Sequence, residues 1–139
     1  MKQIVILLAA TASLSACATQ PTSPTDAKPV PAQRVFNQAL ATPAAGKTEV
    51  RFVRDVGFLG GGVKARLSLN GQPFAELGAG ESFSIYLVPR IYTFSMIQRP
   101  NLFGYEVPRE IEVEVKPGRT MKIRIGFSDN GPIFSPMTY

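Results

Sequence analysis

The sequence predicts an all-β fold, a small antiparallel β-sandwich of about seven strands, and two observations support this prediction. From Glu49 onward, apolar residues alternate with polar ones, the pattern of strands that turn one face to a core and the other to water. The alternating runs are short and are separated by Gly, Pro and Asn turn signals. The single cysteine, Cys17, has no partner for a disulfide, so core packing must hold the domain together.

The expected strands follow one another with short connections. In the last of them, apolar residues at 121, 123, 125 and 127 are separated by single residues, which places all four on one face. Short strands at this spacing are typical of a sandwich or a small barrel. The expected strands are residues 49–56, 63–69, 74–77, 82–87, 91–98, 110–116 and 121–127.

Two proline turns allow the pairing of neighbouring strands to be predicted. With residues 89–90 as a two-residue hairpin loop, Leu87 lies opposite Tyr92, and the apolar sets of both strands share one face. In the last hairpin, a three-residue loop places Glu114 opposite Lys122, whereas a two-residue loop would mix the polar and apolar faces. We therefore expect two hairpins, the second of which carries a ladder of cross-strand ion pairs.

The N-terminal residues resemble the signal peptide of a bacterial lipoprotein. One positive charge in residues 1–3 precedes an apolar run at 4–10, which is too short to span a bilayer, and small residues follow. The run Leu14-Ser15-Ala16-Cys17 resembles the lipobox of that family. The resemblance implies that residues 1–16 are removed, that a diacylglyceryl thioether forms on Cys17, and that a further acyl chain such as palmitate caps its amine. Several acyl chains make attachment effectively permanent.

Two other interpretations of these residues stay open. An ordinary secretory signal could end at Ala10-Thr11-Ala12, and a transmembrane helix would need a longer apolar run. Within the lipoprotein interpretation, the residue after the cysteine is Ala18 and not an aspartate. By resemblance to enterobacterial lipoproteins, this favours the outer membrane over the inner membrane. The expected location is the cell envelope, with the domain lipid-anchored and facing the periplasm.

Residues 17–33 are expected to be the lipidated cysteine and a disordered tether, because this Pro/Thr-rich segment has too little apolar bulk to offset its ordering entropy. At about 3.1 Å per residue, a proline-rich segment of this length would reach roughly 50 Å. Residues 34–139 are the expected domain. Pro31–Ala41 predicts a short helix at the start of the domain, with proline in its first turn. A loosely ordered extension of the tether is the alternative.

The composition gives little support for catalysis or metal binding. The chain has no histidine, and its one thiol is expected to carry lipid, so the commonest general base and a thiol nucleophile are both missing. Glu110, Glu112 and Glu114 lie on the polar face of one expected strand, beside cations and in water. We therefore expect no enzyme activity, no catalytic residue, no cofactor and no metal.

The net charge of +5 bears on the choice of partner. The 15 basic and 10 acidic side chains form no long runs, which argues against nucleic-acid binding. A modest positive charge could attract an anionic envelope partner such as lipopolysaccharide, peptidoglycan or an acidic protein face. Mixed charges that only keep the strand faces soluble are the alternative.

Two loops with apolar residues are the candidate contacts with a partner. The first is glycine-rich, at residues 57–62, but it lacks the lysine and hydroxyl residue that end a phosphate-binding loop. Apolar residues on loop tips often mark contact with a partner or a membrane, although they can also pack back onto the core. The candidate contact residues are Phe58, Leu59, Leu102, Phe103 and Tyr105.

The turns of the domain carry a further resemblance. An Asn70-Gly71 turn is followed by the segment 74–80, then by a strand, a proline turn and another strand. This layout over residues 50–125 resembles the uncharacterised β-rich domains of bacterial envelope lipoproteins, among them sandwich domains named for a Pro-Glu-Gly-Ala signature. Arg90 stands where those domains usually have glycine. The resemblance implies a sandwich fold and an envelope setting, and carries over no active-site residue.

The combined expectation is a membrane-anchored, non-enzymatic binding or accessory module with an envelope protein as partner. The alternative is a structural subunit of an envelope assembly such as a secretion or pilus machine. An unpaired strand edge along Glu49–Val56 would favour that alternative, because a free edge can add a strand from another protein.

Overall fold

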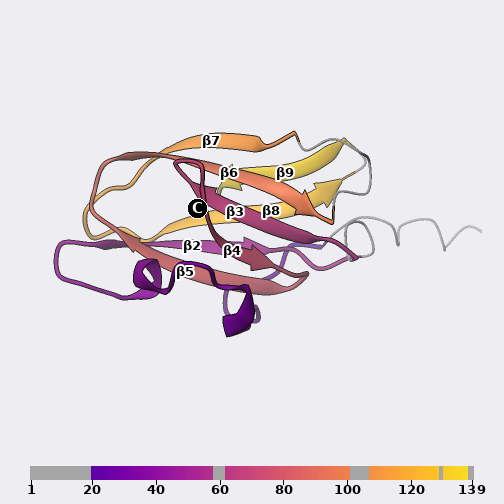
Figure 1. The fold of residues 1–139 in the computed structure, drawn as a ribbon, viewed down its shortest axis with the longest axis horizontal. Helices are drawn as coiled ribbons and strands as arrows, with labels where there is room; N and C mark the ends of the chain where they lie inside the picture. The colour runs from indigo at the N-terminus through magenta and orange to yellow at the C-terminus, as the bar shows by residue number, and fades with distance from the viewer. Residues whose placement is uncertain (1–19, 58–61, 101–106, 129, 138–139) are drawn as a thin grey trace, which may run out of the picture.

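The computed structural model describes residues 20–57, 62–100, 107–128 and 130–137. It confirms the all-β prediction, since two sheets pack face to face around one core (Figure 1). All seven expected strands are present, together with a short strand before them and a further strand after them. The elements are β1 (Lys28–Pro29), η1 (Ala32–Arg34), η2 (Gln38–Ala41), β2 (Thr48–Arg54), β3 (Lys64–Leu69), β4 (Gln72–Leu77), β5 (Glu81–Leu87), β6 (Ile91–Arg99), β7 (Arg109–Glu114), β8 (Met121–Ser128) and β9 (Gly131–Pro136).

The two sheets differ in the direction of their strands. The four-stranded sheet has the order β4-β3-β6-β7 and is antiparallel throughout. The five-stranded sheet has the order β1-β5-β2-β8-β9 and is mixed, because β1 runs parallel to β5 and β2 runs parallel to β8. The expected antiparallel sandwich is therefore present, and these two parallel pairs are its exceptions. Between β2 and β8 the chain builds the whole four-stranded sheet, which is the long crossover that a parallel pair requires.

Both hairpins predicted at the proline turns are wrong. β5 and β6 belong to different sheets, and Leu87 pairs with Thr48 while Tyr92 pairs with Val113. β7 and β8 are also in different sheets, so Glu114 lies opposite Ile91. The alternation identified the face that each strand turns to the core, but both inner faces of a sandwich share one core, so the pattern does not choose between sheets.

The Asn-Gly turn does form a hairpin, which joins β3 to β4. Leu69 pairs with Gln72 across the two turn residues. Asn70 has φ 46° and Gly71 has φ 81°. Two consecutive positive φ values define the type I′ turn, whose twist matches that of the flanking strands. This turn requires residues that tolerate the left-handed region, and Asn-Gly is the favoured pair.

Aromatic side chains from both sheets meet at the centre of the core. The Phe52 ring of β2 lies 5.4 Å from that of Phe74 and 5.2 Å from that of Phe94, measured between ring centroids. All three side chains are almost fully buried. Tilted and edge-on ring pairs at this spacing add to the free energy gained from burial. Most of the rest of the core consists of alternating strand residues without rings: Val50, Leu67, Leu77, Ile85, Met96, Ile123 and Ile125 are also almost fully buried.

From Gln20 onward, the segment predicted to be a disordered tether packs against the sandwich. Gln20 forms a β-bridge with Val56, and β1 pairs with the edge of β5. Val30 belongs to the hydrophobic core. The segment fails to remain free because its backbone groups pair with a sheet edge, where proline is tolerated since one side of an edge strand needs no donor. The tether prediction is therefore wrong for residues 20–33.

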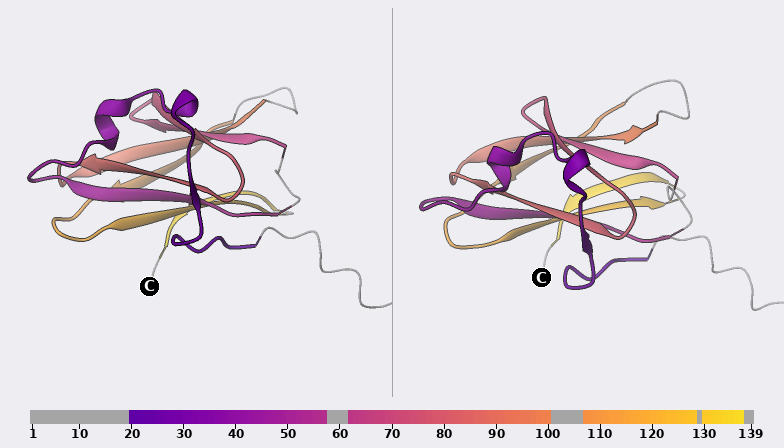
Figure 2. Two further views of the ribbon diagram at one scale, coloured as in Figure 1. Left: turned by 90° about the horizontal axis from the view of Figure 1, so that it is seen from below. Right: turned by 60° about the horizontal axis from the view of Figure 1, so that its bottom comes forward.

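The helix predicted at Pro31–Ala41 is replaced by two short 3₁₀ turns, η1 and η2. Between them, Val35 forms a bridge with Ala75 of β4, and the Phe36 N–H donates to the Phe74 carbonyl at 2.8 Å. These edge contacts replace hydrogen bonds that a continuous helix would make within itself. The N-terminal segment, residues 20–41, thus runs from the edge of the five-stranded sheet to the edge of the four-stranded sheet (Figure 2).

Candidate functional site

The N-terminal segment is held to the sandwich by a pair of charged residues. Arg34 Nη1 donates to Glu81 Oε2 at 2.8 Å, its Nη2 pairs with the second carboxylate oxygen, and Nη1 also donates to the Glu76 carbonyl at 3.1 Å. The Gly78 N–H donates to Glu81 Oε2 at 2.6 Å. The two-pronged geometry suits a guanidinium and a carboxylate. We call this set, Arg34 and Glu81 with their backbone partners, the clamp.

The electrostatics of the clamp favour the charged forms of both side chains. Burial alone would raise the pKa of Glu81, but the hydrogen bonds from Arg34 and Gly78 and the charges of Arg34 and Arg54 together lower it. The hydrogen bond to Glu81 raises the pKa of Arg34 against the effect of burial. Glu81 is therefore ionised at neutral pH, which suits an ion-pair partner and not a general acid.

Two further arginines support the sheets nearby. Arg66 pairs with Glu76 at 2.6 Å and lies over the Phe36 ring, 5.4 Å from its centroid. Arg54 is 1% exposed, donates to the Leu77 carbonyl and lies 5.0 Å from the centroid of the Phe127 ring. Burial lowers the pKa of Arg54 to about 10, which still leaves it charged at neutral pH. Arg54 joins the two sheets, and Arg66 joins β3 to β4 and to the N-terminal segment, so both arginines serve the fold.

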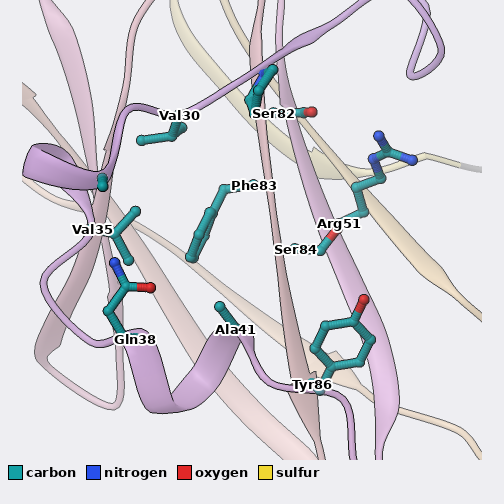
Figure 3. A pocket seen from close by; sticks show the side chains of 11 residues that line it. Val30, Val35, Gln38, Ala41, Arg51, Ser82, Phe83, Ser84 and Tyr86 are labelled. Carbon is teal, nitrogen blue, oxygen red and sulfur yellow. The ribbon is translucent and has the colours of Figure 1, made fainter.

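A hollow of about 360 Å³ lies between the N-terminal segment and β5. Figure 3 shows Val30 and Val35 on one wall facing Phe83 on the other, with Tyr86 farther along β5. Its polar lining residues include Gln38, Arg51, Ser82, Ser84 and Tyr86. The hollow is open and of mixed polarity, and it separates two parts of the same chain.

A second hollow, of about 400 Å³, lies at the end of the sandwich formed by the β7–β8 turn, which we call the Arg119 end. Three of its lining residues are basic, namely Lys116, Arg119 and Lys122. Met121 and Met137 supply the apolar part of the wall. A partly apolar concave surface with several cations suits an anionic partner.

Exposed apolar residues lie close to the basic hollow. Val88 is 56% exposed and Ile91 is 60% exposed, on either side of the turn between β5 and β6. The Val115 N–H donates to the Arg90 carbonyl at 2.9 Å, which holds this turn beside the β7–β8 turn. Exposed apolar residues beside cations mark a surface that can contact another molecule. We call Val88, Ile91, Lys116 and Arg119 the Arg119-end surface.

None of the residues predicted as functional contacts lies in the described part of the chain. Cys17, Phe58, Leu59, Leu102, Phe103 and Tyr105 all lie outside it. Two residues that flank these segments do lie within it, and both are exposed apolar side chains: Val56 at 41% and Val107 at 71%. The three glutamates of the charge ladder lie at exposed positions on β7.

The clamp, the buried Arg54 and the basic hollow were not predicted from the sequence. Glu76 and Glu81 were noticeable only as acidic residues near strand ends, and no spacing pattern links them to Arg34, which lies more than 40 residues earlier. Within residues 20–57, 62–100, 107–128 and 130–137, no three His, Cys, Asp or Glu side chains come together to hold a metal ion. In the same residues, no helix has the length and hydropathy needed to cross a membrane.

No protein-family model and no curated protein sequence matches this chain. The function of the protein must therefore be inferred from its own residues.

Proposed function

We propose that this protein is a lipid-anchored binding or accessory module of the bacterial cell envelope, facing the periplasm. The observation that carries the proposal is the run Leu14-Ser15-Ala16-Cys17 after a short apolar segment, with an all-β domain beginning at Gln20. Acyl chains on Cys17 would hold the domain at a membrane and give it a high effective concentration toward neighbouring molecules. Ala18 favours the outer membrane over the inner membrane as the site of anchoring.

The role is binding and not catalysis. The ionisable side chains that the fold buries, such as Glu81 and Arg54, form contacts between strands or between the N-terminal segment and the sheets. The Arg119-end surface combines exposed apolar residues with cations and is the best-suited contact surface within the described residues. Its chemistry fits an anionic envelope component, for example an acidic protein face.

Replacing Cys17 with serine tests the anchor. The expected result is loss of membrane retention on cell fractionation, together with loss of the diacylglyceryl and acyl masses from the mature N-terminus. Ser15→Ala, which keeps a small residue at a neighbouring lipobox position, is the matched control and should leave both unchanged. Unaltered membrane retention of the Cys17→Ser protein would refute the proposal.

Site-specific photo-crosslinking in living cells tests the contact surface. A crosslinker at Ile91 or Arg119 should capture a defined envelope component, and one at the exposed Gln33 of the N-terminal segment should not. Crosslinkers at Phe58 and Phe103 test the loops predicted from the sequence. If none of the crosslinkers at Ile91, Arg119, Phe58 and Phe103 captures a component, the binding role is left without support.

The alternative role, a structural subunit of an envelope assembly, depends on a free strand edge. β2 does not provide one, since β5 pairs with one of its sides and β8 with the other. Among the described strands, the edge strand β9 contains Pro132 and Pro136, and the edge strand β7 carries exposed glutamates. Proline and like charges on an edge discourage strand addition. These features favour the binding module over the structural subunit.

A further inference from the structure

The first described residue fixes where the chain enters the sandwich. The Gln20 N–H donates to the Val56 carbonyl at 2.7 Å, and the Val56 N–H donates to the Gln20 carbonyl at 3.1 Å. Val56 follows the end of β2, so the chain enters at that end of the sandwich, which we call the Val56 end. In the sequence, only Ala18 and Thr19 separate Gln20 from Cys17.

Two intervening residues cannot form a stalk. A fully extended chain spans at most about 3.6 Å per residue, so the Cα atoms of Cys17 and Gln20 are at most about 11 Å apart. The headgroup layer on each side of a bilayer is roughly 5 to 8 Å thick. A cysteine whose acyl chains are inserted in the bilayer would therefore leave Gln20 at or just above the headgroups.

The Val56 end gathers several exposed basic and apolar residues. Figure 1 shows the ends of β6 and β8 and the starts of β7 and β9 together at one end of the sandwich. Lys64 of β3 lies opposite Arg99 of β6 in the register of the sheet. The Nη2 atom of Arg109 of β7 lies 3.6 Å from the place that a Cβ added to Gly131 would occupy. Arg54 bonds the end of β2 to the end of β4, which places β2 at this same end. Val107 is the most exposed large apolar side chain in the described residues.

We propose that the Val56 end of the sandwich docks directly on an anionic membrane surface, with Lys64 and Arg109 toward the headgroup phosphates and Val56 and Val107 at the interface. This proposal rests on the lipidation of Cys17 proposed above. The tether expected from the sequence would hold the domain roughly 50 Å from the membrane, whereas in this proposal the domain contacts the bilayer directly. The nine residues of β6 give the sandwich a length of about 30 Å, so the Arg119-end surface faces away from this membrane.

The charges at the Val56 end match this orientation. A Lys or Arg close to an anionic bilayer strengthens binding about five-fold, and the effect falls off within a Debye length. Cations at the Arg119 end, about 30 Å from the surface, lie beyond that distance at physiological ionic strength. Glu110, the nearest described acidic residue along β7, follows Arg109 directly and pairs across the sheet with Ser95.

The orientation is tested with a fluorophore on the lipidated, full-length protein in vesicles of phosphatidylcholine and phosphatidylglycerol. The thiol of Cys17 is consumed by lipidation, so an introduced cysteine is the only one that reacts with the dye. The fluorescence of a dye attached at Val107→Cys should be quenched by a spin label on the lipid headgroup, and that of a dye attached at Arg119→Cys should not. Equal quenching at both positions, or none at Val107→Cys, overturns the proposal.

Two changes to the protein test the cause of the orientation. Sixteen Gly/Ser residues inserted after Ala18 would allow a mean reach of roughly 20 to 24 Å and should reduce quenching at Val107→Cys several-fold. The double substitution K64E/R109E should also reduce this quenching, whereas K116E/R119E at the opposite end should leave it unchanged. Quenching that is insensitive to both the spacer and K64E/R109E refutes direct docking.

A failure of docking is distinguishable from a failure of the anchor. If the protein carries no acyl mass at Cys17 and is released from membranes, the proposed function itself is wrong. If it is acylated and retained but Val107→Cys is not quenched, the anchor stands and only the orientation is wrong.

Discussion

The substitution Glu81→Gln should destabilise the protein by loosening its N-terminal segment. The carboxylate of Glu81 accepts two hydrogen bonds from Arg34 of η1 and one from the Gly78 N–H. A glutamine has nearly the same shape and keeps an oxygen for Gly78, but it presents an NH₂ group to the guanidinium and has no charge. The substitution therefore tests the ion pair with little change in packing.

The size of the effect follows from the partial burial of the pair. The side chains of Arg34 and Glu81 are 19% and 16% exposed. Hydrogen bonds to charged groups contribute about 1.5–3 kcal/mol, and breaking a fully buried ion pair costs about 3–5 kcal/mol. Because water reaches this pair, we expect a loss of about 2 kcal/mol at neutral pH. Glu114→Gln, which breaks a 3.4 Å pair between side chains at least 60% exposed, is the control and should change stability by less than about 0.5 kcal/mol.

The pH dependence provides an independent check. Since folding lowers the pKa of Glu81, the unfolded chain binds more protons than the folded protein between the two pKa values, and stability rises with pH there. The contribution is complete above the ordinary carboxyl pKa of about 4.5 and is lost as the pH falls through the lower, folded value. The difference between wild type and Glu81→Gln should therefore shrink in acid.

Urea unfolding of the unlipidated Cys17→Ser protein from pH 3 to 7 gives the stability difference, and amide hydrogen exchange locates it. Exchange should accelerate first in residues 20–41, because the clamp joins them to β5. If Glu81→Gln matches wild type at pH 7, or if the difference is the same at pH 3, the clamp does not stabilise the fold through its ion pair.

Three further substitutions probe the fold, each measured by urea unfolding. Phe52→Ala empties the centre of the core and should cost about 3–5 kcal/mol, whereas Val107→Ala at an exposed position should change stability by less than about 0.5 kcal/mol. Gly126→Ala places a Cβ 2.6 Å from Asp55 Oδ2, so it should break the ion pair of Asp55 with an arginine of β8 and cost about 1–3 kcal/mol. Gly71→Ala meets no neighbour but forces φ 81° on an alanine, so it should cost about 1–2 kcal/mol from the backbone alone. A neutral result for Gly71→Ala would mean that the turn relaxes.

The strands could be predicted from the sequence because their signal is local. Each inward residue of β8, such as Ile123 and Ile125, is buried as its alternation predicts. The turn at Asn70-Gly71 could also be recognised from the sequence, because asparagine and glycine are the residue types that tolerate the two positive φ values of this hairpin. The short β1 was not recognised, because its two residues pair with an edge and show no alternation of their own.

The pairing of the strands could not be predicted from the same signal. Leu87 and Tyr92 do both face the core, but from opposite sheets. A turn of two residues looks the same in sequence whether the chain returns to the same sheet or crosses to the other one. The choice depends on which strands β2 accepts as neighbours, and one of these, β8, comes 67 residues after the end of β2.

The N-terminal segment shows how composition can mislead. Proline and small polar residues predicted a free tether, but the same residues suit a sheet edge, where a missing N–H costs little. One apolar residue, Val30, reaches the core, and one arginine, Arg34, finds a carboxylate about 47 positions away. Local composition cannot predict these partners, because they lie far away in the sequence.

Edge protection and the membrane attachment that we propose involve the same segment. Residues 28–29 cover the edge of β5, and Val35 pairs with the edge strand β4, so the segment shields one side of both sheets. The same segment begins at Gln20, three residues after the cysteine that we propose is acylated. A force on the anchor therefore acts first on the bridge between Gln20 and Val56 and then on the clamp at Glu81. A domain attached through a free stalk would turn every face to its surroundings, whereas the attachment that we propose through this paired segment would favour one end of the sandwich toward the membrane and leave the other for a partner.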